Sequence, residues 1–386
     1  PAQRYGPLRG RGRALTGLTA ACPPPSPLGR AVLAATTPAE LAAAVDGAGY
    51  LPAGLGDLRT AIAELLTSTG LPTTEDEVIV TTGAHQAIGL ATSLLGGAGQ
   101  AVLVEDATYP GALDIVRGAG MRPVAVPLDA DGVLPDAVED LLDRVRPAFV
   151  YLVPAHQNPT GSVLPAARSR AVAALSAAFR VPVVEDLALR YLEIDGRPMP
   201  APIAAHGPDG RSMMIGSASK VLWGGLRLGW IRAARPVVER LMRLKIVADL
   251  GSPVLAQVLA ARLLPRFGEA VAERRAFLGE RYAALSDALA RHLPSWSWEP
   301  PRGGCTLWVR IPSGDARGFG QVAQRCGVNV VPGQALSAEG RHEDRLRVPF
   351  VHDPPVLEEA ARRLAVAWDI YAGAPQRPRE AAGLIV

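Results

Sequence analysis

The chain has 386 residues and a formal net charge of +3, with 48% hydrophobic and 20% charged residues. This length allows one large or two ordinary domains, and so small a net charge gives no argument for a nucleic-acid or membrane partner. No apolar run is long enough to span a membrane, and no signal-peptide pattern precedes the first structured segment. The three cysteines are widely spaced. We therefore expect no structural disulfide, no metal site and a cytoplasmic protein.

The N-terminal segment is rich in glycine, arginine and proline, a composition typical of a linker or an extended arm. We expect residues 1–30 to form such an arm rather than packed core. A helical pattern follows over residues 28–45. The loop 47–54 then separates this pattern from the next helix.

From residue 56 onward, helical and strand patterns alternate. Short apolar runs separated by helices predict a mainly parallel sheet with helices on both faces. Ligands of such sheets bind beyond the carboxyl ends of the strands. The expected strands are 78–81, 101–104, 123–126, 148–153, 181–184, 213–215 and 228–231, and the expected helices are 56–69, 84–95, 109–119, 134–145, 164–179 and 235–249.

A long helical pattern over residues 266–292 leads to a C-terminal region of different character. Its strand patterns and terminal helix predict a smaller α+β domain. The expected strands are 306–310, 328–331 and 346–348, and the expected helix is 355–371. We therefore divide the chain into an arm (1–30), a large α/β domain (31–285) and a small domain (286–386).

Lysine is almost absent from this chain, since Lys220 and Lys245 are its only two lysines among 40 Lys and Arg residues. Arginine stays protonated, whereas a lysine with a lowered pKa is a nucleophilic amine. Lys220 lies in a loop between two apolar runs, where reactive groups are commonly placed, and it is our candidate nucleophile. Lys245 lies within a helical pattern and is expected to be a solvated position.

Two segments are suited to binding a phosphate group. At 81–86 a strand ends in a glycine turn that opens a helix, so the backbone around Gly83, Ala84 and His85 would face an anion. Such turns are common in α/β proteins, and this one needs support from other residues. The loop that contains Lys220 provides that support.

Ser217 and Arg227 flank Lys220 in its loop. The guanidinium of Arg227 can bind a phosphate ester while the amine of Lys220 reaches an aldehyde on the same small molecule. Farther along, strand alternation places Arg345 and Arg347 on one face, where one of them can bind a substrate carboxylate.

Three more candidates follow other strands of the sheet. The ring of Tyr109 either lies against a flat heterocycle or packs in the core. Asn158, in the turn 156–161, offers an amide donor to an anionic oxygen. Asp186 ends the strand 181–184, where burying a carboxylate is costly unless it is paired. A protonated pyridine nitrogen is a suitable partner, and together these residues describe a pyridoxal phosphate site.

The chain resembles the fold type I pyridoxal-phosphate enzymes of the class I/II aminotransferase family over residues 30–372. Its motifs are most similar to the aminotransferase-like domain of MocR-type (GntR-family) regulators. The patterns Gly-Tyr-x-Pro-x-Gly, His-Gln-x-Pro-Thr-Gly and Ser-Lys-x-x-x-x-Gly-Leu-Arg-x-Gly correspond to residues 49–54, 156–161 and 219–229.

The resemblance implies a homodimer with shared active sites and pyridoxal 5'-phosphate as cofactor. It implies that Lys220 forms the Schiff base, that Asp186 contacts the pyridine nitrogen, and that Tyr109 stacks on the ring. It also implies that Asn158 contacts the ring oxygen and that Arg347 binds the substrate carboxylate, with Asn158 and Tyr50 as further substrate contacts. The implied phosphate contacts are Gly83, Ala84, His85, Ser217, Arg227 and the partner subunit's Tyr50.

One position departs from the family pattern. Many of these aminotransferases have a tyrosine three residues after the pyridine aspartate, and this chain has Leu189 there. Tyr191 would need a shift of backbone to take its place. The missing phenol removes one control on the proton affinity of the Schiff base, which affects transamination more than cofactor binding.

Several functions share these residues. The first is an enzyme acting on an α-amino acid or a related amine, with transamination as the default outcome and elimination, decarboxylation, racemisation or cyclisation as alternatives. The second is the effector domain of a transcription regulator, which would contact nucleic acid only through a separate winged-helix domain. The S-x-x-K pattern of penicillin-binding serine enzymes occurs at 217–220, but their S-D-N and K-T-G elements are absent from the sequence. We expect pocket residues from the N-terminal arm, from 50–53 and from Trp223.

Overall fold

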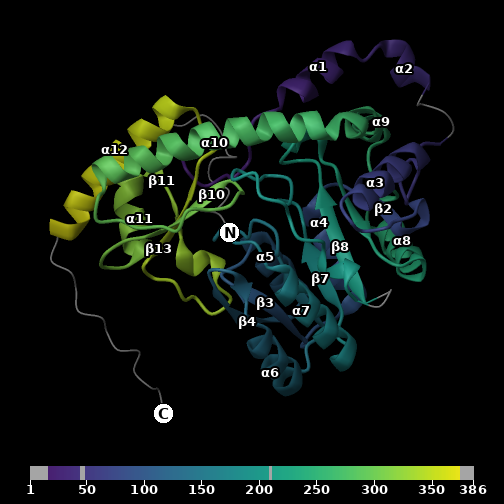
Figure 1. The fold of residues 1–386 in the computed structure, drawn as a ribbon, viewed down its shortest axis with the longest axis horizontal. Helices are drawn as coiled ribbons and strands as arrows, with labels where there is room; N and C mark the ends of the chain where they lie inside the picture. The colour runs from purple at the N-terminus through teal and green to yellow at the C-terminus, as the bar shows by residue number, and fades with distance from the viewer. Residues whose placement is uncertain (1–15, 44–47, 208–210, 374–386) are drawn as a thin grey trace.

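The computed structural model describes residues 16–43, 48–207 and 211–373 (Figure 1). Its larger part is built on an eight-stranded sheet with the order β2-β9-β8-β7-β6-β3-β4-β5. The neighbours from β8 through β4 are all parallel, whereas β9 is antiparallel to both β2 and β8. These strands are β2 (Val78–Thr81), β3 (Ala101–Asp106), β4 (Arg122–Asp129), β5 (Gly132–Val133), β6 (Phe149–Leu152), β7 (Val183–Asp186), β8 (Ser212–Ser217) and β9 (Gly229–Arg232).

Helices cover both faces of this sheet, which confirms the predicted α/β class. One face packs against α4 (Ala84–Leu95), α5 (Pro110–Gly118) and α8 (Arg235–Asp249). The opposite face packs against α6 (Pro135–Val145) and α7 (Ala166–Phe179) around β3, β6 and β7, and against α3 (Gly56–Ser68) and α9 (Val254–Leu263) near β2 and β9. The central strands are therefore buried on both sides, which explains their continuous apolar sequences.

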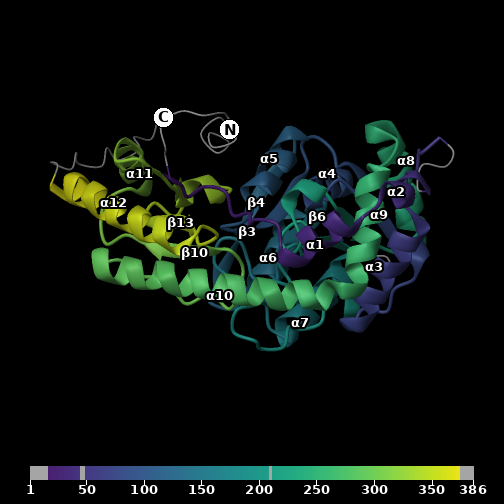
Figure 2. The same cartoon turned by 90° about the horizontal axis from the view of Figure 1, so that it is seen from above.

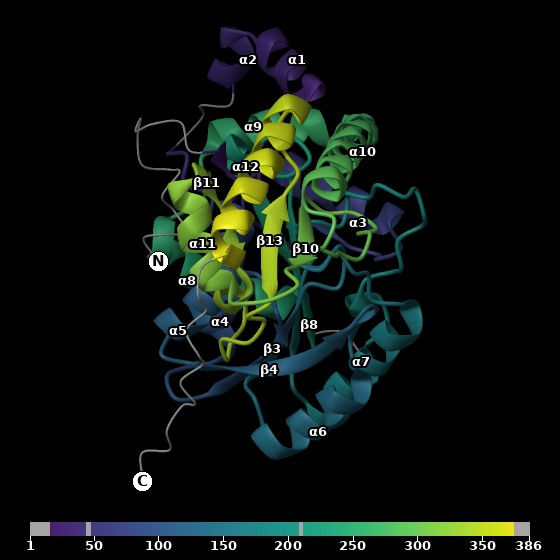
Figure 3. The same cartoon turned by 90° about the vertical axis from the view of Figure 1, so that its left-hand side faces the viewer.

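The C-terminal part is a smaller α+β layer. Its antiparallel sheet has the order β10-β13-β12, formed by β10 (Thr306–Arg310), β13 (Arg345–Pro349) and β12 (Val331–Pro332). The helices α11 (Ala316–Arg325) and α12 (Pro354–Gly373) pack on this part, as Figure 3 shows from that side. The strand expected over 328–331 is two short strands in different sheets, because β11 (Val328–Asn329) pairs with the N-terminal segment.

The long helix α10 (Phe267–His292) runs alongside both parts of the molecule, and α12 lies next to it (Figures 1 and 2). Its apolar side chains contribute to the same core cluster as β2 and β10. The helix therefore holds the two parts in a fixed arrangement. The division of the chain between residues 285 and 286 stays a prediction.

The N-terminal segment is part of the packed structure. The strand β1 (Thr16–Gly17) pairs with β11, and the side chain of Leu18 is fully buried. The helix α1 (Pro27–Ala35) follows, capped by Ser26, whose Oγ accepts a hydrogen bond from the Gly29 N–H at 3.0 Å. The expectation of an unpacked arm over 1–30 is therefore wrong for residues 16–30, while residues 1–15 lie outside the described ranges. Proline misled the prediction because it also suits the first turn of a helix.

The helix expected over 28–45 is interrupted. After α1 the backbone is extended at Thr36, and α2 (Pro38–Ala43) begins with a second proline. Proline cannot donate the hydrogen bond that would continue the first helix, so the chain starts a new one.

Lys245 is buried, contrary to the expectation of a solvated position. Its side chain is fully buried on α8, and its Nζ donates hydrogen bonds to Asp249 at 2.8 Å and to Gln86 Oε1 at 3.1 Å. Burial lowers the pKa of Lys245, and the carboxylate of Asp249 opposes that change. The second lysine of the chain therefore has a structural environment away from the cavity described below.

Replacing Lys245 with methionine is expected to lower the free energy of unfolding by about 1–3 kcal/mol. The substitution keeps the apolar volume but leaves Asp249 and Gln86 without their shared donor. Urea unfolding followed by circular dichroism measures the change. Arg243→Met, an exposed position on the same helix, is the control. Equal losses in the two variants would show that the buried ion pair contributes nothing specific.

Within the described ranges, no helix combines the length and the apolarity that crossing a membrane requires.

Candidate active site

A cavity of about 420 Å³ lies at the carboxyl ends of the central strands, where the small domain faces the large one. This volume falls within the usual range for sites that bind small molecules. Every candidate site residue except Tyr50 lines it, namely Gly83, Ala84, His85, Tyr109, Asn158, Asp186, Ser217, Lys220, Arg227 and Arg347. The topology thus brings together residues that are far apart in the sequence.

One end of the cavity is suited to an anion. Gly83 precedes the first residue of α4 and has a φ of 89°, which favours glycine, and a Cβ there would lie 3.2 Å from the Arg227 guanidinium. Arg227 in turn donates to the Thr82 carbonyl at 2.9 Å, which fixes the guanidinium beside the helix N-terminus. Ser217 adds a hydroxyl from the end of β8. Unpaired helix N–H groups, a hydroxyl and a guanidinium form a donor set suited to a phosphate ester.

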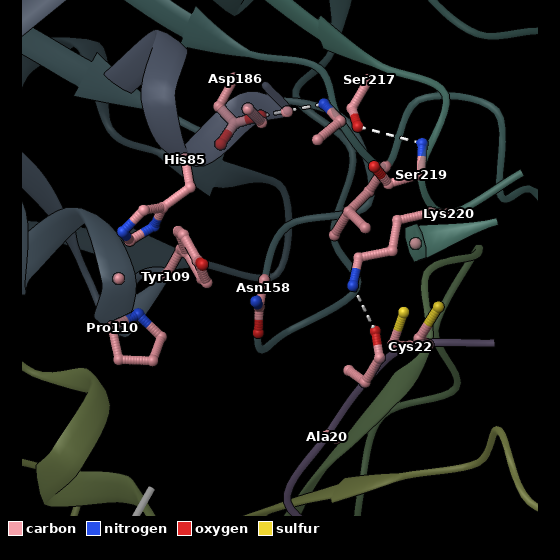
Figure 4. A pocket seen from close by; sticks show the side chains of 18 of the residues that line it. Ala20, Cys22, His85, Tyr109, Pro110, Asn158, Asp186, Ser217, Ser219 and Lys220 are labelled. Atoms are coloured by element: carbon pink, nitrogen blue, oxygen red, sulfur yellow. Dashed lines mark hydrogen bonds between the residues drawn. The ribbon is translucent and has the colours of Figure 1, made fainter. Parts of the chain in front are cut away.

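His85 and Tyr109 lie on the side of the cavity opposite Lys220, and Asn158 lies between that side and Lys220 (Figure 4). Partial burial lowers the pKa of His85, and the positive charge of Arg227 lowers it further, so the imidazole is neutral at pH 7. The Tyr109 ring lies over Gly111, where a Cβ would come within 2.5 Å of the ring. Glycine at that position therefore lets the tyrosine ring lie close to the first turn of α5.

Asp186, the last residue of β7, lines the cavity with a buried carboxylate. Its Oδ2 accepts a hydrogen bond from the Tyr151 hydroxyl at 2.8 Å, and its Oδ1 accepts one from the Ala188 N–H at 2.9 Å. Burial raises the pKa of Asp186, although these two donors and the charge of Lys220 oppose the rise. A carboxylate in this environment is suited to pair with a cation in the cavity, such as a protonated ring nitrogen.

The N-terminal segment reaches into the same cavity. Lys220 Nζ donates to the Ala21 carbonyl at 2.8 Å, as Figure 4 shows. Arg347 donates to the Thr19 carbonyl at 2.7 Å and to Asn158 Oδ1 at 3.4 Å. Residues from the N-terminal arm thus line the cavity as expected, but the two carbonyl contacts had no signal in the sequence.

Other expected pocket residues lie elsewhere. Neither Trp223 nor the segment 50–53 lines the cavity of the described chain, and Tyr50 is 67% exposed. Arg345 also lies outside it, beside Asp344 at 3.9 Å. Of the two arginines on β13, Arg347 is therefore the one available to a bound molecule.

Leu189 lines the cavity, and Tyr191 does not replace the missing tyrosine. The Tyr191 ring packs edge-on against Phe267, with 4.9 Å between the ring centroids. Sequence analysis did not identify the lining residues Cys305, Thr306 and Val331 of the small domain. They lack any motif, and only the packing of the two parts brings them to the cavity.

The residues present fit pyridoxal phosphate. The anion site accommodates a phosphate ester, and Asp186 and Lys220 line the same cavity. A planar ring carrying an aldehyde can bridge these groups within the observed volume.

The sequence model of the aminotransferase class I and II family matches residues 23–364. The chain belongs to this family. The family and the cavity chemistry together support a pyridoxal-phosphate-dependent, aminotransferase-like enzyme. This outcome confirms the family, the fold type I architecture and the cofactor expected from the motifs.

Individual relatives of this aminotransferase agree with that placement. The chain is 34% identical over 298 residues to a 2-aminoadipate transaminase of Thermus thermophilus, covering 76% of this chain and 75% of the relative. It is also 34% identical over 266 residues to an HTH-type transcriptional regulator of Bacillus subtilis, covering 68% of this chain and 54% of the regulator. The match to regulators was expected from the motifs, and the transaminase relatives favour the enzyme.

The solved structure of an α-aminoadipate aminotransferase from Thermus thermophilus, complexed with N-(5'-phosphopyridoxyl)-L-leucine, is similar to this aminotransferase over 93% of each chain. The TM-score is 0.83 and the sequence identity is 30%. A kynurenine aminotransferase from Pyrococcus horikoshii gives a TM-score of 0.86 at 26% identity, covering 96% of this chain and 97% of the other.

Proposed function

We propose that this protein transfers the amino group of an α-amino acid to pyridoxal phosphate held through Lys220, and from there to a keto acid. The observation that carries the proposal is the convergence of Lys220, Asp186 and Arg347 on one cavity. An amine, a buried carboxylate and a carboxylate-binding guanidinium are the groups that such a transfer needs. The alternative outcomes, which use the same groups, are separated by the experiment below.

Each residue has a defined task in this proposal. Bound pyridoxal phosphate supplies an aldehyde that bonds to amines and a ring that withdraws electrons from the bonded amine. Asp186 holds the proton on the ring nitrogen, and Arg227 with Ser217 binds the phosphate. Lys220 Nζ holds the cofactor until a substrate amine replaces it, and then takes the proton from the substrate Cα.

Arg347 binds and orients the substrate carboxylate in this proposal. Its guanidinium donates to the Thr19 carbonyl at 2.7 Å, a neutral acceptor. A carboxylate accepts charge-assisted hydrogen bonds that are roughly twice as strong, so a substrate can displace the Thr19 carbonyl. Asn158 lies beside Arg347 and orients the ring oxygen of the cofactor and the substrate.

The test is an absorbance experiment on the protein loaded with pyridoxal phosphate. A panel of amino acids is added without any keto acid, and the spectrum is recorded. We expect conversion to the pyridoxamine form with release of one keto acid per site. Leu189 would then be a tolerated replacement for tyrosine. A keto acid released together with free ammonia, with the cofactor kept in its aldehyde form, would favour elimination instead. A spectrum that stops before the pyridoxamine form, with no keto acid, would favour cyclisation or the regulator.

We also propose a homodimer with shared sites, in a cytoplasmic protein of MocR-like descent. Large apolar side chains are exposed on neighbouring segments, namely those of Tyr50, Val247, Leu250 and Leu255. Val247 is 88% exposed and Leu255 is 47% exposed. The backbone of Leu51 lies against Gly251, which places the loop of Tyr50 beside this surface. A second copy covering it would bring the partner subunit's Tyr50 to the phosphate end of the cavity.

Sedimentation equilibrium is expected to give twice the monomer mass at micromolar concentration. Val247→Asp is expected to shift the protein toward monomer, because a carboxylate would be buried unpaired in the interface. Val366→Asp, an equally charged substitution at an exposed valine on α12, is the control for added negative charge. A wild-type protein of monomer mass would exclude the shared site.

A further inference from the structure

We propose that Tyr151 is a positioning residue for Asp186. The hydroxyl of Tyr151 keeps the Asp186 carboxylate ionised and directed toward the ring nitrogen of the cofactor. This inference rests on the proposed function, because it concerns the same site. Nothing in the sequence motifs points to Tyr151, which lies within the apolar strand 148–153. The contact becomes visible only when neighbouring strands are paired.

The pairing of β6 with β7 produces the contact. Tyr151 stands opposite Val184, two residues before Asp186, so its long side chain reaches the end of the neighbouring strand. The phenol oxygen lies 2.8 Å from Asp186 Oδ2, and only 1% of the Tyr151 residue is exposed. The Ala188 N–H binds the other carboxylate oxygen at 2.9 Å. One donor on each oxygen fixes the plane of the carboxylate and leaves further lone pairs for a group in the cavity.

The surroundings of Asp186 make the Tyr151 hydroxyl necessary to keep the Asp186 carboxylate ionised. Asp186 is itself 5% exposed, and the buried carboxyl of Glu105 lies close enough to influence it electrostatically. Burial raises the pKa of Glu105 to about 7, with its hydrogen bonds to Gln157 and Val153 acting in the opposite direction. Burial favours the neutral form of Asp186, whereas a hydroxyl donor favours the ionised form that a cationic ring requires.

Tyr151 keeps its proton under working conditions. Burial raises the pKa of Tyr151 well above its usual value, and the neighbouring Asp186 raises it further. The phenol is therefore a hydrogen-bond donor across the pH range in which an aminotransferase is assayed. Its ring also belongs to the core cluster under α4 and α5, which holds the donor in place.

This contact gives a physical account of how the site functions with Leu189. The cavity has an apolar side chain where many relatives carry a phenol near the ring oxygen. The Tyr151 phenol would act instead through Asp186, the carboxylate that would hold the ring nitrogen. Control of the cofactor through Tyr151 and Asp186 is thus independent of position 189.

The decisive comparison is Tyr151→Phe against Tyr191→Phe. Both substitutions remove one buried hydroxyl, but the Tyr151 hydroxyl binds Asp186, whereas the half-buried Tyr191 packs against Phe267. Losing a hydrogen bond to a charged group is expected to weaken pyridoxal phosphate binding roughly tenfold in Tyr151→Phe, measured by fluorescence titration. The rate of the amino-acid half-reaction is expected to fall roughly ten- to one-hundred-fold. The KM for the amino acid should not change, because Arg347 is untouched.

The pH dependence of the half-reaction rate separates this role from a purely structural one, because a purely structural role would leave that dependence unchanged. The Tyr151 hydroxyl lowers the pKa of Asp186, so removing it raises that pKa, and the acidic limb of the half-reaction profile moves to higher pH. Asp186→Asn completes a double-mutant cycle. If Tyr151 acts through Asp186, adding Tyr151→Phe to Asp186→Asn causes no further loss of cofactor affinity. Thermal unfolding of each variant monitors folding.

Two results would overturn the inference. One is cofactor affinity and pH profile in Tyr151→Phe equal to those in Tyr191→Phe. The other is a further loss of cofactor affinity when Tyr151→Phe is added to Asp186→Asn. A wild-type protein that binds pyridoxal phosphate without amino transfer would contradict only the proposed function, because the affinity comparison needs no turnover. Weaker binding by Tyr151→Phe would support the inference in that case also.

Discussion

Substituting Lys220 by alanine is expected to abolish covalent attachment of pyridoxal phosphate and to reduce the half-reaction rate by at least roughly 10²–10⁴-fold, the usual effect of removing a general base. Alanine cannot bond to the aldehyde, and no other amine faces the cavity among the described residues. The measurement combines the absorbance spectrum with borohydride reduction and peptide mass spectrometry. Reduction should fix the cofactor to the peptide containing Lys220 in the wild type only.

The near absence of lysine leaves few alternative sites at which the cofactor could be attached. Lys245 is the only alternative lysine, and it is fully buried beside Asp249. Lys245→Arg, which keeps the charge, should retain the wild-type spectrum and the modified Lys220 peptide. An unchanged spectrum in Lys220→Ala would instead disprove the whole site assignment, because every other role is placed relative to that amine.

The second large effect is expected from Arg347→Met. Losing a charge-assisted clamp on the substrate carboxylate should cost about 3 kcal/mol of transition-state binding, or roughly a hundredfold in kcat/KM. The spectrum of the bound cofactor should not change, since Arg347 contacts the Thr19 carbonyl and Asn158 rather than the phosphate end. Stopped-flow measurement of the half-reaction with amino acids measures the loss.

Arg345→Met is the matched control for this variant. The two arginines lie two residues apart on β13, yet only Arg347 lines the cavity. The control should change kcat/KM by less than about threefold, because the half-buried Arg345 does not line the cavity. Equal losses in both variants would show that the strand tolerates neither substitution, and Arg347 would lose its role as carboxylate clamp.

The residues that surround the cavity could be predicted where a strand ends in a recognisable turn. The glycine turn before Ala84, the turn containing Asn158 and the loop of Lys220 each combine an apolar run with residues of defined backbone preference. In a parallel sheet the carboxyl ends of the strands meet at one edge. Local sequence therefore specified both the element and the side of the sheet on which its functional residue would lie.

The role of a single charged residue was harder to predict. Lys245 occupies an ordinary helical position, and its burial follows from the packing of α8 on α4, where Gln86 and Asp249 provide its partners.

The N-terminal segment was likewise misjudged from residue 16 onward. Its composition suits a linker, but its pairing with β11 and the burial of Leu18 depend on a distant strand. Composition reports solubility and flexibility, not a partner more than 300 residues away.

The sequence by itself determined the fold class, the cofactor and most of the candidate residues that line the cavity, because these depend on hydrophobic periodicity and on short motifs that act locally. Only the tertiary structure decided which of the two arginines on β13 faces the cavity, that Tyr191 turns away from it, and that Tyr151 binds Asp186. These outcomes depend on which strands and loops become neighbours and in what register. A contact between side chains on different strands is a property of their pairing, and neither strand encodes it alone.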